Sequence, residues 1–275
     1  MAGLTWKAAA LLLWAGHATA QALPESNRET QVYRPQYDAI CAAGQSLSAG
    51  CDTIRAREIV DAAQAPWRAV GRVNFASGRT RHHCTGTLVA EQVVLTAAHC
   101  VFNFTETRWI VPKDLTFVAG FQRGDFVGAA QVERYVLDPL VDLSVRSFSV
   151  PPARDWALLV LTEPLGRLAG RVPVALDSSV TGPVLAGYAG LRPQVVSVAN
   201  DCGPARAAIG LPFIQVRCAA MRGDSGGPLL ERREAGWRVV GVFSSLLQRT
   251  DGVVGAAVPV QRFREALEDL IGAPL

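Results

Sequence analysis

Lysine and histidine are both scarce in this chain of 275 residues. Lys7 and Lys113 are the only lysines, so arginine carries almost all of the positive charge, and four histidines are present. The net charge of +3 is too small to favour nucleic-acid binding. The sequence also lacks an uninterrupted apolar run of the roughly 20 residues that a membrane-spanning helix needs. We therefore expect no nucleic-acid partner and no membrane span.

The start of the chain nevertheless has the pattern of an export signal. Lys7 is followed by the apolar run Ala8–Ala15, and Ala18-Thr19-Ala20 has the small residues that a signal peptidase cuts after. Residues 1–20 are therefore predicted to be a signal peptide, and the mature protein is expected to be secreted or periplasmic. Residues 21–58 are polar and rich in turn-forming residues, which is typical of a pro-segment or N-terminal extension, and 59–275 form the main domain.

The most unusual stretch is Gly223-Asp224-Ser225-Gly226-Gly227. Glycine permits close approaches of the backbone, so this stretch can present the Ser225 hydroxyl while the amides of Gly223 and Ser225 converge on one point. Such amides can hold the oxyanion that forms when a serine attacks a carbonyl. The alternative interpretation is a glycine-rich turn capped by Asp224.

A serine nucleophile needs a base, and no histidine follows Ser225. The pattern Gly223-x-Ser225-x-Gly227 fits the nucleophile elbow of α/β-hydrolases, but that fold places its histidine after the serine, so it is excluded. The other order is histidine, aspartate, serine. The chain supplies it as His99 in Leu95–Cys100, Asp155 in Arg154–Leu159, and then Ser225. Weaker candidates for the acid are Asp138 and Asp142.

These three motifs, in this order, resemble the trypsin/chymotrypsin-like serine peptidases over most of Ile59–Leu275. The resemblance implies that His99 is the general base, Asp155 the acid that orients it, and Ser225 the nucleophile, with the amides of Gly223 and Ser225 as the oxyanion hole. The expected reaction is hydrolysis of a protein or peptide substrate through an acyl-enzyme, by a monomer without a cofactor. The short interval between Asp155 and Ser225 is typical of bacterial members.

The resemblance also implies an all-β fold of two six-stranded antiparallel barrels, with the active site between them. Short apolar segments separated by turns agree with this from Ala69 to Val260, among them Val93–Thr96, Ala157–Leu161 and Val172–Leu176. The apolar residues after Pro259 recur at helical spacing, which predicts a C-terminal amphipathic helix packed on the body.

Six cysteines in an exported protein predict disulfides. The resemblance implies a Cys84–Cys100 bridge that staples the histidine loop. Cys202 and Cys218 are expected to bridge the approach to the serine, which leaves Cys41 and Cys51 to pair. The alternative is a metal site, and we expect none, because the export signal and the even number of cysteines favour disulfides. Its ligands would be His82, His83, Cys84, His99 and Cys100.

Many members of the family are zymogens whose mature chain begins at Ile-Val. The new ammonium then pairs with the carboxylate beside the nucleophile, which would make Ile59 and Asp224 an activation pair. This sequence departs from the pattern, because Glu58 rather than a basic residue precedes Ile59 and Asp61-Ala62 replaces the usual glycines. Activation by cleavage before Ile59 is therefore a hypothesis.

Residues of the primary substrate pocket can also be assigned by the resemblance. Ala219 stands at the position of the pocket floor, where an aspartate would select Arg or Lys, and Ser244-Ser245-Leu246 replaces the Ser-Trp-Gly of the wall. Leu246 is expected to narrow the pocket, which predicts small or apolar side chains before the cut bond. The alternative is a non-catalytic binding protein with an obstructed pocket.

Overall fold

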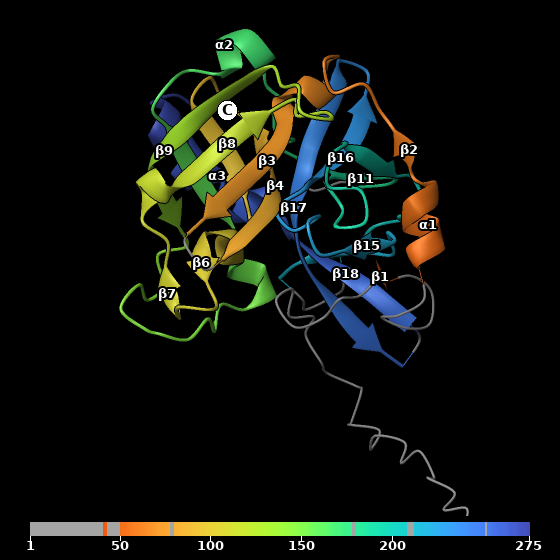
Figure 1. The fold of residues 1–275 in the computed structure, drawn as a ribbon. Helices are drawn as coiled ribbons and strands as arrows, with labels where there is room; N and C mark the ends of the chain where they lie inside the picture. The colour runs from red at the N-terminus through yellow and green to blue at the C-terminus, as the bar shows by residue number, and fades with distance from the viewer. Residues whose placement is uncertain (1–40, 43–49, 78–79, 178–179, 208–211, 251) are drawn as a thin grey trace, which may run out of the picture.

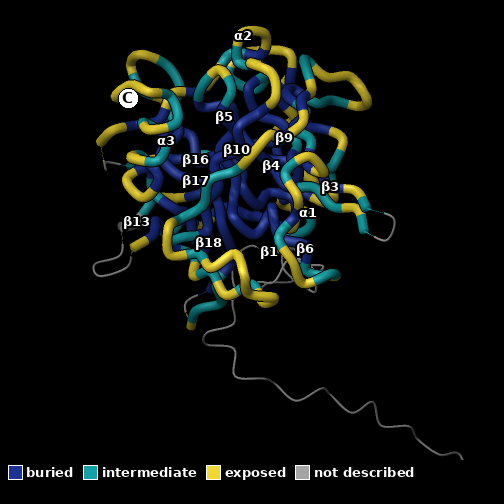
Figure 2. The backbone as a smooth tube through the Cα atoms, turned by 90° about the vertical axis from the view of Figure 1, so that its left-hand side faces the viewer, coloured by how far each residue is buried: buried dark blue, intermediate teal, exposed yellow. Residues whose placement is uncertain are grey.

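The computed structural model describes residues 41–42, 50–77, 80–177, 180–207, 212–250 and 252–275. The predicted signal peptide and most of the extension 21–58 lie outside these residues. Two halves built mainly of strands lie side by side, with the strands of the first orange to green and those of the second teal to blue (Figure 1). Buried residues gather along the strands, and exposed residues lie in the connecting loops and in the short helix α2, Gly166–Ala169 (Figure 2). None of the helices in these ranges has the length and apolarity to span a membrane.

Six antiparallel strands of the first half close into a barrel in the order β10-β5-β4-β3-β8-β9. Their side chains meet inside, where the Phe117 ring packs against Gly71, so that a Cβ there would lie 2.6 Å from the ring. β10 is an unbroken apolar run because all five of its residues are buried. The strands are β3 (Val70–Ala76), β4 (Arg81–Leu88), β5 (Val93–Thr96), β8 (Leu115–Ala119), β9 (Gly128–Leu137) and β10 (Ala157–Leu161).

The second half is an eight-stranded sheet in the order β13-β14-β18-β17-β16-β11-β12-β2. The expected second closed barrel of six strands is therefore not formed by the described residues. At one edge of the sheet, β2 of the N-terminal segment pairs with β12. At the other edge lies β13, which is followed by residues 208–211, outside the described ranges. The strands are β2 (Glu58–Ile59), β11 (Val184–Gly187), β12 (Ser197–Ala199), β13 (Arg206–Ala207), β14 (Ile214–Val216), β16 (Pro228–Arg233), β17 (Gly236–Arg249) and β18 (Gly252–Pro259).

Two local predictions differ from the structure. The expected strand Val172–Leu176 is reduced to a single bridge between Val174 and Val239. A hairpin that the sequence did not reveal joins β6 (Phe102–Asn103) to β7 (Arg108–Trp109), and the rings of Phe102 and Trp109 pack edge to face at 5.2 Å. Each of these strands has only two residues, too few to show an alternating pattern, which explains why the sequence did not indicate the hairpin.

The predicted C-terminal helix is present as α3, Arg264–Ile271. Phe263 and Leu267 are fully buried, and the Phe263 ring lies 6.0 Å from the ring of Trp156, just before β10. The helix therefore closes over the core of the first half, with its charged residues outward.

The described part of the N-terminal segment packs on the second half, where it is orange in Figure 1. β1 (Cys41–Ala42) pairs with β15 (Ala220–Met221), and α1 (Cys51–Ala56) buries Ile54 against Ala219 and Met221. The described residues of this segment therefore pack on the second half, while the role of 21–58 as a pro-segment or extension stays a prediction.

Candidate active site

His99 lies in a 3₁₀ turn, Ala98–Val101, that directly follows β5. The neighbouring Cys100 is joined to Cys84 of β4 by a disulfide with an S–S distance of 2.07 Å, and Thr96 donates a hydrogen bond to the Thr85 carbonyl at 2.8 Å. Both contacts fix the turn to the barrel wall, so the imidazole has a defined position at the end of the strand.

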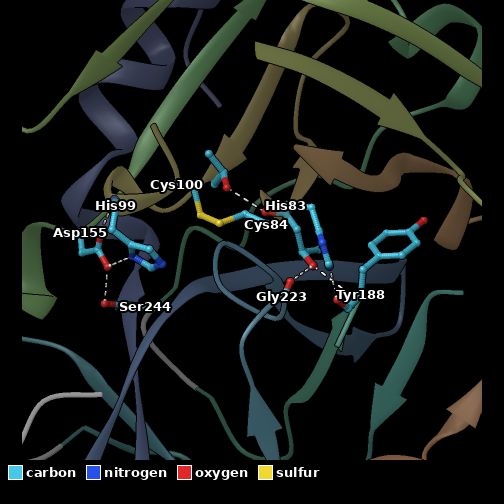
Figure 3. Close-up of a disulfide and its surroundings, with 10 residues drawn as sticks. His83, Cys84, His99, Cys100, Asp155, Tyr188, Gly223 and Ser244 are labelled. Atoms are coloured by element: carbon cyan, nitrogen blue, oxygen red, sulfur yellow. Dashed lines mark hydrogen bonds and ion pairs between the residues drawn. A yellow bond between two sulfur atoms is a disulfide. The ribbon is translucent and has the colours of Figure 1, made fainter. Parts of the chain in front are cut away.

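Asp155 lies immediately before β10 and faces His99 (Figure 3). Its Oδ2 accepts from His99 Nδ1 at 2.7 Å and from the Ser244 hydroxyl at 2.6 Å, while its Oδ1 accepts from the His99 amide at 2.9 Å. A carboxylate can only accept, so Nδ1 carries the proton and Nε2 is left as the basic nitrogen. The structure brings His99 and Asp155 together in the arrangement that general-base catalysis needs.

Asp155 is buried, and burial by itself would raise the pKa of its carboxyl. The facing His99 and the hydrogen bonds from His99 and Ser244 oppose this and lower the pKa below the ordinary value. The carboxylate is therefore ionised at neutral pH and stabilises the imidazolium that forms when His99 takes a proton. Ser244, which the sequence assigned to the pocket wall, donates its hydroxyl hydrogen bond to this aspartate, and its place in the wall stays a prediction.

Ser225 lies in the turn between β15 and β16, within a segment that we call the oxyanion loop, Met221–Gly227. The loop packs tightly on the first half: the Thr85 amide donates to the Ser225 carbonyl at 2.8 Å. A Cβ at Gly226, where φ is +75°, would lie 2.1 Å from Thr96 Oγ1, so this position requires glycine. The motif is glycine-rich because its backbone touches the strands that carry the histidine.

Ser225, Gly223 and His99 line one cavity of about 160 Å³. His99 Nε2 is buried there and has no hydrogen-bond partner among the described residues, and Ser225 makes no hydrogen bond to it. The structure thus places nucleophile and base at the same cavity, with the basic nitrogen free to receive a proton.

Within the described part of the chain, three amides of the oxyanion loop have no acceptor: those of Arg222, Gly223 and Ser225. The other amides are engaged: Asp224 donates to the Met221 carbonyl at 3.0 Å, and Gly226 donates to the Phe243 carbonyl at 2.8 Å. Free neighbouring amides beside a serine can stabilise an oxyanion.

Thr85 supports this loop, and sequence reasoning missed it. Its hydroxyl donates to the Gly223 carbonyl at 2.7 Å and accepts from the Tyr188 amide at 3.0 Å. His83 adds a hydrogen bond from Nε2 to the Tyr188 carbonyl at 2.9 Å (Figure 3). The Gly223 backbone is therefore held from the side of the first barrel.

His82 and His83 lie at the start of β4, as half-buried residues beside the cavity. The pKa of each is lowered to about 4, chiefly by burial, and for His83 the nearby Arg72 contributes to the lowering. Both are neutral at pH 7. A metal site with them is disfavoured, because the sulfurs of Cys84 and Cys100 are bonded to each other although they and His99 form a compact group.

The remaining cysteines are also engaged where they are described. Cys202 and Cys218 form a disulfide with an S–S distance of 1.96 Å, and Cys51 is disulfide-bonded. The side chain of Cys41 lies outside the described residues, so the expected Cys41–Cys51 pair stays a prediction.

The residues assigned to the primary pocket are all buried. Ala219 packs against Ile54 of α1, and Leu246 belongs to the hydrophobic cluster of the second half together with Phe243 and Cys218. Ser245 is buried next to Ser244. The residue assigned to the pocket floor is thus small and apolar, and Leu246 fills space in a different hydrophobic cluster from that of Ala219.

The proposed activation pair is apart in this uncleaved chain. Ile59 is 37% exposed in β2, whereas Asp224 is fully buried and forms an ion pair with Arg57 at 2.8 Å. The pairing of Asp224 with a new terminus at Ile59 remains a prediction about the cleaved chain. Arg57 was overlooked because nothing local distinguishes it from the many other arginines. The only indication in the sequence that such a residue must exist is that a buried carboxylate at Asp224 requires a cation nearby.

Comparisons with known proteins agree with the site. A family model described as trypsin matches residues 57–267. CLIP domain-containing serine protease B4 of Anopheles gambiae is 27% identical over 242 residues, which cover 75% of this chain and 67% of that protein. Transmembrane protease serine 5 of Homo sapiens is 26% identical over 239 residues, which cover 74% of this chain and 50% of that protein.

The chain therefore spans between one half and about two thirds of the length of these relatives. Both are animal proteins, so the comparison does not establish a bacterial origin. A solved structure of a Glu endopeptidase has the same fold, with a TM-score of 0.61 and 19% identity over 78% of this chain and 96% of that one. With a mostly β fold, a His–Asp pair, a serine at the same cavity and a family match over most of its length, the chain belongs to the trypsin family of serine peptidases and is a trypsin-like serine endopeptidase.

Proposed function

We propose that this protein is an exported endopeptidase that cleaves peptide bonds through His99, Asp155 and Ser225, with a preference for small or apolar residues before the cut bond. The observation that carries the proposal is the chain of contacts from Ser244 through Asp155 to His99, which ends at a free Nε2 in the cavity that Ser225 lines. The export signal at residues 1–20 supports action outside the cytoplasm.

Each step of the reaction has a group suited to it. Ser225 Oγ attacks the carbonyl carbon while its proton passes to His99 Nε2, and Asp155 stabilises the imidazolium. The carbonyl oxygen becomes an oxyanion that the amides of Gly223 and Ser225 can receive. His99 then returns the proton to the leaving amine, and water repeats the sequence on the acyl-enzyme, which restores the serine.

The specificity is supported by the floor and wall of the primary pocket. Ala219 offers no charge to hold an Arg or Lys side chain, and the buried Leu246 occupies the position where the family has glycine. A long or charged side chain would have to displace Leu246 from its cluster or enter without an ionic partner. Small and apolar side chains incur neither cost.

The test is to digest a peptide library derived from a proteome and to map the cleaved bonds by mass spectrometry, with Ser225→Ala as the inactive control. We expect cuts after alanine, valine and leucine that vanish in the variant. Cuts concentrated after Arg, Lys, Asp or Glu would reject the specificity. The absence of serine-dependent cleavage would favour the alternative, a binding protein with an obstructed pocket.

A further inference from the structure

The side chain of Asp224 carries its charge where an unpaired charge would be strongly unfavourable. It is 0% exposed and lies between Gly223 and Ser225, two residues that line the cavity. A buried carboxylate requires a cation or several donors. The orientation of the oxyanion loop therefore depends on what neutralises Asp224.

In the uncleaved chain the guanidinium of Arg57 binds this carboxylate at both oxygens. Nη1 donates to Oδ1 at 2.8 Å and Nη2 donates to Oδ2 at 2.9 Å, and Nη2 also donates to the Ala219 carbonyl at the pocket floor. The Arg57 side chain is only 2% exposed. A two-point ion pair of this kind fixes both the position and the direction of the carboxylate.

Arg57 is itself held in place by its neighbours in the chain. Its amide donates to the Ile54 carbonyl of α1 at 3.3 Å, and its carbonyl accepts from Arg192 Nη1 at 2.5 Å. The residues that follow it, in β2, pair with β12. The guanidinium is thus presented by a segment that is anchored on both sides.

An ammonium at Ile59 could reach Asp224 only by displacing this arrangement. The Asp224 oxygens already accept from the two Arg57 nitrogens and from the Met221 amide at 2.9 Å. Ile59 lies in a paired strand with more than a third of its surface exposed. Cleavage before Ile59 would therefore have to remove Arg57 before a new pair could form.

We propose that Arg57 is the positioning residue of the oxyanion loop, and that it makes the uncleaved chain competent for catalysis without a new terminus at Ile59. The guanidinium neutralises Asp224, and the same contact fixes the Ala219 carbonyl and the Gly223–Ser225 backbone. The kinetic consequence rests on the proposed peptidase function, while the ordering of the loop does not.

The test uses the full chain, shown by intact mass to be uncut between Glu58 and Ile59. Arg57→Met removes the charge at similar length. The matched control is Arg55→Met, two positions earlier in the last turn of α1, because the Arg55 side chain is 58% exposed and pairs only with the exposed Asp52 among the described residues. We expect Arg57→Met to lower kcat by about 10²–10³-fold, the loss found when an oxyanion donor is removed, with little change in KM. Arg55→Met should stay within about twofold of the parent.

Hydrogen exchange of the oxyanion loop provides a second readout that needs no activity. Arg57→Met should speed exchange in peptides covering residues 219–227, and Arg55→Met should not. Because Arg57→Met leaves Asp224 unpaired and can unfold the protein, the double variant Arg57→Met/Asp224→Asn removes both charges. It should regain the parent melting temperature while kcat stays low and exchange in the loop stays fast.

The proposal is overturned if Arg57→Met keeps parental kcat and slow exchange, or if the double variant regains full kcat. It is also overturned if the uncleaved parent is inert and gains activity only after the Glu58–Ile59 bond is cut. If neither the uncleaved nor the cleaved chain hydrolyses any peptide, the proposed function has failed, and the exchange comparison still decides the role of Arg57.

Discussion

Replacing Thr85 with valine removes one hydroxyl that holds two backbone groups of the active site. The Gly223 carbonyl loses its donor and the Tyr188 amide loses its acceptor, and all three residues are buried. Valine has nearly the shape of threonine, so the packing in β4 is preserved. The variant therefore isolates the hydrogen bonds of Thr85 from its volume.

The expected loss follows from the cost of unpaired buried groups. Each is worth roughly 1–3 kcal/mol, so the two together destabilise the folded state by about 2–6 kcal/mol. For a domain of this size, this corresponds to a fall in melting temperature of roughly 5–20 °C. If the oxyanion loop moves to find new partners, the Gly223 amide leaves its position and kcat falls by up to about 10²–10³-fold.

Thr87 in the same strand is the matched control. Its hydroxyl is buried and has no hydrogen-bond partner in the described part of the protein. Thr87→Val should leave the melting temperature unchanged or raise it, and kcat should stay at the parental level. Differential scanning calorimetry and peptide hydrolysis measure both effects. Equal behaviour of Thr85→Val and Thr87→Val would refute the role assigned to Thr85.

Three further changes have defined outcomes. Ser244→Ala removes a hydrogen bond to the charged Asp155, while the bonds from His99 remain. We therefore expect steady-state kinetics to show kcat reduced about tenfold with KM unchanged. An unaltered kcat would contradict this. In the folded state the pKa of His82 and of His83 is about 4, below the ordinary value of about 6.5. Between pH 4 and 6.5 the unfolded state therefore binds more protons than the folded state, so the stability to urea should fall as the pH drops from about 6.5 to 4. His83→Gln should make that decline shallower, and an unchanged slope would show that His83 does not contribute. Leu246→Gly should raise kcat/KM for phenylalanine relative to alanine before the cut bond by at least about tenfold, whereas an unchanged ratio in competing-substrate assays would show that Leu246 does not limit the pocket.

The candidate triad could be proposed from sequence because each residue lies in a short motif that resembles one of the trypsin-like peptidases. His99 and Ser225 sit where glycine, alanine and cysteine allow close packing, and their order along the chain excluded the elbow alternative. The C-terminal helix was equally readable, since the periodicity that buries Phe263 and Leu267 is local.

The supporting contacts could not be predicted, because they join residues far apart in sequence. Arg57 and Asp224 are separated by 167 positions, and Thr85 and Gly223 by 138. Neither arginine nor threonine stands in a distinctive motif there, and their partners depend on how the two halves pack. The edge strand β2 has a similar cause, because its pairing with β12 unites segments that nothing local connects.

The proposed function requires Ser225 to be an activated nucleophile. The most direct test is to measure the intact mass of the protein after incubation with a fluorophosphonate probe. The probe phosphonylates a serine, with loss of fluoride, only when a base such as His99 removes the hydroxyl proton, and the same spectrum reports where the chain begins. We predict one adduct, mapped to Ser225 by peptide digestion, on a chain uncut at Glu58–Ile59, and none in Ser225→Ala or His99→Ala. The absence of an adduct on both the uncut chain and a chain beginning at Ile59 would contradict the assignment of a catalytic serine.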